Sequence, residues 1–137
     1  MTHTKQIFTG LVAGLALAAV TLPAIAHHST NGIYDQAVEV ELSGKVKAWK
    51  FINPHPSLTL TVVDEKGEAH DWDVSYGGSA VAHLKRRGYG ADTFKPGDEL
   101  KVKGHPALVK EAYGLLMEGG NPTHADGTPW ALTPPAR

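Results

Sequence analysis

The sequence predicts a mainly β fold, namely a small antiparallel OB-like barrel of about five strands with one short inserted helix. Several short stretches alternate apolar and polar residues, which is the period of a half-buried strand. Turns containing Gly, Pro or Asn separate these stretches. The chain has no cysteine, and closing a barrel protects strand edges without disulfides. A small β-sandwich is the alternative arrangement.

The alternating stretches give the expected strands. The first ends where Pro54 and Pro56 forbid ladder hydrogen bonds, and Gly44 within it indicates a bulge or a bend. The second and third flank a Gly-containing turn at 64–67 and therefore form a hairpin. The expected strands cover residues 38–52, 58–62, 70–76, 99–104 and 112–118.

One helix is expected between the third and fourth strands. Ser79 is a suitable N-cap for residues 80–87, basic side chains close the last turn, and Gly88 ends the helix. The tail from residue 119 is rich in Gly and Pro, and Trp130 is its expected anchor.

The first 26 residues have the pattern of a cleavable secretory signal peptide. The apolar run 7–22 follows the basic Lys5, and Ala24-Ile25-Ala26 supplies a small-x-small cleavage site after Pro23. The run is shorter than the roughly 20 apolar residues that a membrane span needs. We therefore expect a periplasmic protein without a stable membrane anchor, whose residues 27–137 form one domain with an N-terminal arm and a Pro/Gly-rich tail.

Charge and composition exclude several classes of function. Removal of Lys5 with the leader leaves 12 basic and 14 acidic side chains, and this near balance argues against a nucleic-acid partner. The lack of cysteine excludes thiolate chemistry, Cys-ligated zinc and iron–sulfur clusters. Neither a nucleophile motif nor a phosphate-binding loop is present, so we do not expect an enzyme.

Five short motifs occur in order along the mature chain. They are His27-His28-Ser29, Asn53-Pro54-His55, Leu84-Lys85-Arg86-Arg87-Gly88, Lys95-Pro96-Gly97-Asp98 and Gly104-His105-Pro106-Ala107. As an ordered set, they resemble a family of small exported bacterial proteins that is classed as a domain of unknown function. This resemblance implies a periplasmic OB-like barrel and does not imply a reaction.

The histidines at the expected mature N-terminus are candidate metal ligands. After cleavage, His27 carries a free α-amine and an imidazole, which together can chelate one ion. A third nitrogen would complete a T-shaped arrangement that suits Cu(II) and resembles the histidine brace of exported copper proteins. His28 offers a second chelate through its backbone amide and imidazole. The plainer interpretation is that these polar residues follow a cleavage site because that segment is solvated.

His55 is the first candidate for the remote ligand, because Pro54 and Pro56 fix its backbone and Asn53 is placed to orient it. His105, at the end of another strand, is the next candidate. The plainer interpretation of either is an imidazole bonded to a nearby carbonyl. His70 shares a strand face with apolar residues and is expected to be half-buried and satisfied.

The leading hypothesis is a non-catalytic periplasmic protein that binds copper through His27, His28 and His55, with His105 as the next candidate ligand. Two alternatives remain. One is a metal-free structural barrel whose partner is an envelope protein. The other is a module that binds a small molecule or an anion through Trp49, Trp72 and the basic end of the helix.

Overall fold

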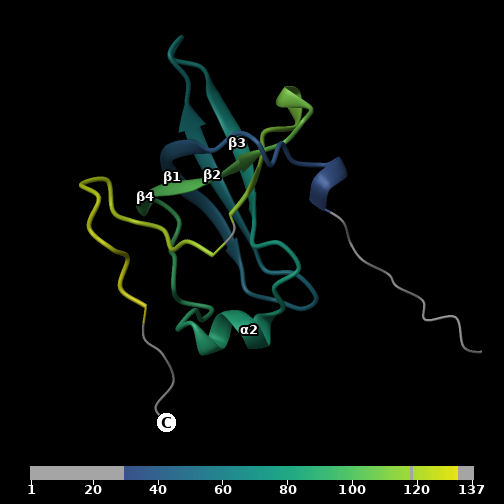
Figure 1. Ribbon diagram of the computed structural model, residues 1–137. Helices are drawn as coiled ribbons and strands as arrows, with labels where there is room; N and C mark the ends of the chain where they lie inside the picture. The colour runs from purple at the N-terminus through teal and green to yellow at the C-terminus, as the bar shows by residue number, and fades with distance from the viewer. Residues whose placement is uncertain (1–29, 118, 133–137) are drawn as a thin grey trace, which may run out of the picture.

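The computed structural model describes residues 30–117 and 119–132, and five strands close into one barrel (Figure 1). The strands follow the order β1-β2-β3-β5-β4, and β4 also pairs with β1. The expected mainly β barrel of five strands with one inserted helix is therefore confirmed. The strands are β1 (Val40–Lys50), β2 (Ser57–Val63), β3 (Ala69–Ser75), β4 (Glu99–Pro106) and β5 (Gly114–Leu116), and the helical segments are η1 (Thr30–Gly32), α2 (Val81–Arg86) and η2 (Lys110–Ala112).

The expectation that all strands pair in antiparallel fashion is wrong at one position, because β3 and β5 are parallel. The four other pairings are antiparallel. The reason is geometric. Strand directions cannot alternate all the way around a closed ring with an odd number of strands, so five strands require one parallel pair.

The last strand is shorter than the expected stretch 112–118. Lys110–Ala112 form the 3-10 turn η2, and Tyr113 ends this turn with a left-handed backbone (φ 46°). β5 then covers only Gly114–Leu116, although the Met117 N–H still donates to the Ser75 carbonyl at 2.8 Å.

The irregularity in β1 lies later than the expected position at Gly44. The register with β2 shifts between Val46 and Ala48, so residues beyond the shift reverse their facing. As a result Trp49 packs inward, and its Nε1–H donates to the Gly90 carbonyl at 2.8 Å. Gly44 is required for a different reason, since a Cβ at this position would lie 2.7 Å from the Thr61 carbonyl oxygen.

The core is apolar and draws on every strand. α2 adds Leu84, which is fully buried. Ser79 does not cap this helix: its N–H donates to the Tyr76 carbonyl, and the N-cap position falls on Ala80, which makes no side-chain cap. The buried core side chains are Val46, Leu58, Leu60, Val74, Tyr76, Leu84, Tyr89, Phe94, Leu100, Val102, Leu115, Leu116 and Met117.

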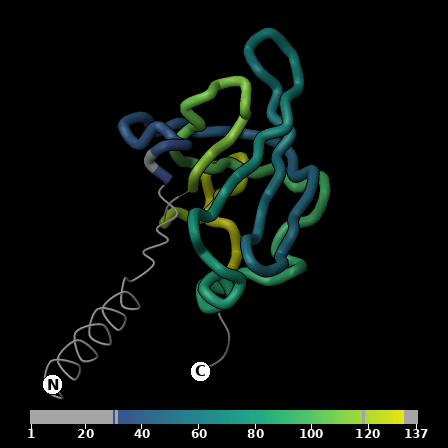
Figure 2. The backbone as a smooth tube through the Cα atoms, turned by 90° about the vertical axis from the view of Figure 1, so that its right-hand side faces the viewer, coloured from purple at the N-terminus to yellow at the C-terminus, as the bar shows by residue number. Residues whose placement is uncertain are grey.

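The barrel has two ends, which we call the helix end and the arm end. α2 and the β1–β2 loop (51–56) lie at the helix end, whereas the β2–β3 turn projects from the opposite end (Figures 1 and 2). The N-terminal arm (30–39) and the β4–β5 loop (107–113) lie at the arm end, joined by the bonds Asp35 N–H to Pro106 O (2.8 Å) and Leu108 N–H to Ile33 O (2.9 Å).

The C-terminal tail is anchored by Trp130, as expected. Its ring packs on Phe94 with centroids 5.5 Å apart, and its Nε1–H donates to the Thr93 carbonyl at 3.1 Å. Within the part of the chain that the structure describes, no helix is long and apolar enough to cross a bilayer.

Candidate functional site

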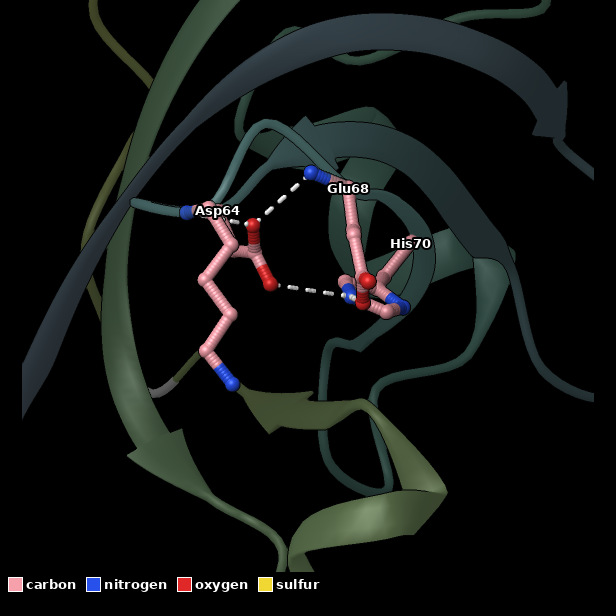
Figure 3. A network of polar contacts seen from close by, with 4 residues as sticks. Asp64, Glu68 and His70 are labelled. Carbon is pink, nitrogen blue, oxygen red and sulfur yellow. Dashed lines mark hydrogen bonds and ion pairs between the residues drawn. The ribbon is translucent and has the colours of Figure 1, made fainter.

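Three side chains of types that can ligate a metal ion converge at the tip of the β2–β3 hairpin. Asp64 and Glu68 flank the turn, and His70 follows on β3 (Figure 3). The His70 Nε2 atom lies 3.3 Å from Asp64 Oδ2 and 3.9 Å from Glu68 Oε2. Among the described residues, this is the one group of three such side chains whose ligand atoms all lie within 4.8 Å of one another. We call it the hairpin triad.

Asp64 is fixed by the turn that it closes. Its Oδ1 accepts the N–H of Lys66 at 2.9 Å and the N–H of Glu68 at 2.8 Å. Chiefly the bond from the Glu68 backbone, and then the contact with His70, lowers the pKa of Asp64 below its ordinary value of 3.8. The carboxylate therefore stays charged at neutral pH, and its Oδ2 faces His70.

An aromatic ring packs against one face of the His70 imidazole. The Tyr113 ring stacks on the imidazole with centroids 4.4 Å apart and an interplanar angle of 13°, and Trp72 meets Tyr113 edge-on at 5.6 Å. Packing of this kind restricts ring orientation, which is how surrounding residues prepare an imidazole for a ligand. The triad is thus partly preorganised, and it stands beside an aromatic cluster.

A groove of about 630 Å³ opens on that aromatic cluster at the arm end. Trp72 and Tyr113 line its wall with apolar residues from the arm and the β4–β5 loop. Its charged side chains are Asp35, Lys110 and Glu111. The remaining lining residues are Val38, Val40, Pro106, Ala107, Leu108 and Gly114. We call it the arm groove.

The structure describes two of the four histidines that the sequence predicts as metal ligands. His27 and His28, like the signal peptide at 1–26, lie outside the described residues. His55 is exposed in the β1–β2 loop at the helix end. His105 lies at the arm end, where its Nδ1 donates to the Val38 carbonyl at 2.8 Å.

His55 and His105 cannot serve one ion. The β-ladders pair Val40 with Gly104 and Lys50 with Ser57, so these histidines flank opposite ends of the 11-residue β1. A strand of that length spans roughly 30 Å when extended. Among the described residues, neither histidine joins a group of three ligands.

Sequence reasoning missed the hairpin triad because it treated 64–67 only as a turn. The pairing of Val63 with Ala69 brings Asp64 and Glu68 face to face across the turn. Two carboxylates flanking a tight turn, followed two residues later by a histidine, were the available signal. The period of two places Glu68 and His70 on one face.

The other candidate residues divide between core and surface. Trp49 is partly buried and packs against the core. Trp72 lines the arm groove. Arg87, at the basic end of the helix, donates to the Gly120 carbonyl at 2.7 Å and to Asn121 Oδ1 at 2.6 Å, so the tail already uses this cation.

The model of a family of unknown function, DUF6152, matches residues 15–116, which is most of the chain. No curated protein matches the sequence significantly. The chain belongs to DUF6152.

Proposed function

We propose that this member of DUF6152 is an exported, non-catalytic binding protein that holds a divalent metal ion at the hairpin triad. The observation that carries the proposal is the convergence of Asp64, Glu68 and His70 with ligand atoms within 4.8 Å of one another. Export is supported by the leader pattern in residues 1–26.

The spacing of the triad supports one shared ion. Ligands about 2.1 Å from a metal stand roughly 3.0–3.4 Å apart in tetrahedral or octahedral geometry. The separations of 3.3 and 3.9 Å between His70 Nε2 and the two carboxylate oxygens need only a small contraction to fit. Two oxygens and one imidazole suit the borderline ion Zn(II) or the harder ion Mn(II), and they disfavour Cu(I).

Zinc calorimetry tests the hairpin site on protein that was exported and confirmed by mass. We expect one equivalent of Zn(II) to bind, and Asp64→Asn with His70→Ala to weaken this binding at least tenfold. His83→Ala is the matched control, because His83 is an exposed imidazole outside the triad. Equal affinity in the double variant and the control would refute the proposal.

Copper is proposed for a second site at the mature N-terminus, formed by His27 and His28. The supporting observation is the position of His105 beside the arm, because its Nδ1 bonds to Val38 within that arm. The three residues from His27 to Thr30 span at most about 10 Å, so a ligand at the arm end is favoured over His55 at the helix end.

Electron paramagnetic resonance of the Cu(II)-loaded protein tests this second site. We expect an axial, nitrogen-rich signal that is lost in His27→Ala, altered in His105→Ala and unchanged in His55→Ala. An unchanged signal in His27→Ala would reject the N-terminal site, and it would not affect the hairpin site.

A further inference from the structure

The arm groove has the features of a ligand site that is independent of the metal site. Its volume of about 630 Å³ falls in the range of small-molecule pockets. Two aromatic rings, Trp72 and Tyr113, stand among aliphatic walls, and only three charged side chains border the groove. Few polar groups on an apolar wall are the usual composition of a site that orients a small organic molecule.

The groove is built on a strained residue that several contacts hold in place. Tyr113 is the only described non-glycine residue with a positive φ, at 46°. Its carbonyl accepts the Asp73 N–H at 2.9 Å, while its ring stacks on His70 and meets Trp72. Backbone strain of this kind persists only where neighbouring contacts hold it and is concentrated at binding sites.

Three exposed apolar side chains lie in the segments that border the groove. Ile33, Leu108 and Val109 are 57%, 53% and 64% exposed, and all three lie in the arm or the β4–β5 loop. Exposed apolar side chains gathered in one place indicate a surface that binds something. The bond from the Leu108 N–H to the Ile33 carbonyl places the two segments side by side.

The charged side chains at the groove favour apolar ligands that carry a positive charge. Asp35 and Glu111 contribute two carboxylates to the groove, against one ammonium from Lys110. Aromatic faces attract alkylated ammonium groups through their ring electrons, and the excess of carboxylate adds to this attraction and repels anions. We propose that the arm groove binds a small organic cation with an alkylated ammonium head and an apolar body.

Three probes whose head groups carry the same three methyl groups test the proposal by NMR on the mature protein. They are choline, its uncharged carbon analogue 3,3-dimethylbutan-1-ol, and the anion 3,3-dimethylbutanoate. The chain has three tryptophans, and the indole signal that Trp72→Leu removes identifies Trp72. We expect choline to shift this signal, and the signals of Trp49 and Trp130 to stay in place because both indoles donate to carbonyls elsewhere.

Variants then test the contribution of the carboxylates separately from that of the Trp72 ring. The double variant Asp35→Asn with Glu111→Gln is expected to weaken choline binding about fivefold, while the amide oxygen that replaces Asp35 Oδ1 can still accept the Ala37 N–H. Trp72→Leu keeps apolar bulk and is expected to weaken binding about tenfold. Glu65→Gln, an exposed carboxylate outside the groove, is the control and should bind choline normally.

The results that would overturn this proposal do not depend on metal binding at the hairpin triad. Equal or tighter binding of the uncharged or anionic probe would overturn the charge assignment, and the absence of any Trp72 shift with all three probes would overturn the site.

Discussion

At the scale of single residues, two buried tyrosines differ in whether their hydroxyl groups form hydrogen bonds. The Tyr76 hydroxyl is buried and has no hydrogen-bond partner among the described residues, and burial raises the pKa of Tyr76 well above 10.0. Nearby, the Tyr89 hydroxyl donates to Asn121 Oδ1 at 3.2 Å. Two buried tyrosines of similar setting therefore differ in what their hydroxyls contribute.

Tyr76→Phe is expected to keep or raise stability, by up to about 1 kcal/mol, because it removes a buried hydroxyl that makes no bond. Tyr89→Phe removes a hydroxyl with a partner and is expected to cost about 1 kcal/mol. Urea unfolding of both variants measures the difference. A loss in Tyr76→Phe as large as that in Tyr89→Phe would show that the Tyr76 hydroxyl is in fact bonded.

Asp64 makes one contribution to the pH dependence of stability. The pKa of its carboxylate is lowered in the folded protein, so its contribution is present at neutral pH and is lost as the pH falls below 3.8. Asp64→Asn should therefore be less stable than the natural protein at pH 7. The gap should close as the pH falls through that region, measured by urea unfolding from pH 7 to 3. A gap independent of pH would contradict the assignment.

At the scale of elements, β4 and β5 close the barrel through a contact that only glycine permits. A Cβ at Gly104 would lie 2.2 Å from the Leu116 carbonyl oxygen, which belongs to the backbone and cannot move aside cheaply. β5 has only three residues, so the closure has few other bonds to hold it. The alternating sequence pattern of β4 gives no sign of this requirement.

Gly104→Ala is expected to destabilise the protein by at least about 2 kcal/mol, since the two strands must separate to admit a methyl group. Gly90→Ala is the matched control, because nothing lies within 4 Å of the added Cβ. Thermal unfolding by circular dichroism compares the two. Similar melting temperatures would contradict the close approach of β4 and β5.

Most of the strands and the helix can be predicted from the sequence, because alternating polarity and turn residues are local signals. The hairpin around 64–67 and the helix after β3 are read directly from these patterns. The inward turn of Trp49 is not, because the bulge that causes it depends on pairing with β2. The parallel pairing of β3 with β5 follows only once closure with five strands is known.

At the scale of the whole molecule, the arm end brings together segments that lie far apart in the sequence. The arm, the hairpin triad and the β4–β5 loop meet there, and Tyr113 links the triad to the arm groove through His70. The arm groove could not be predicted from the sequence, because its lining comes from the arm, the β4–β5 loop and several strands. The hairpin triad lies within residues 64–70, so its signal was local. Of the predicted ligands, His105 lies at this end, His55 lies at the other, and His27 and His28 stay predictions.

A metal ion at the hairpin triad would bind His70 itself, so imidazole ¹⁵N NMR of the mature protein during a Zn(II) titration detects it. We expect the Nε2 signal of His70 to shift and to saturate at one equivalent, and the signals of His83 not to respond. Saturation of other histidines with no change at His70, or no response at any imidazole, would contradict it.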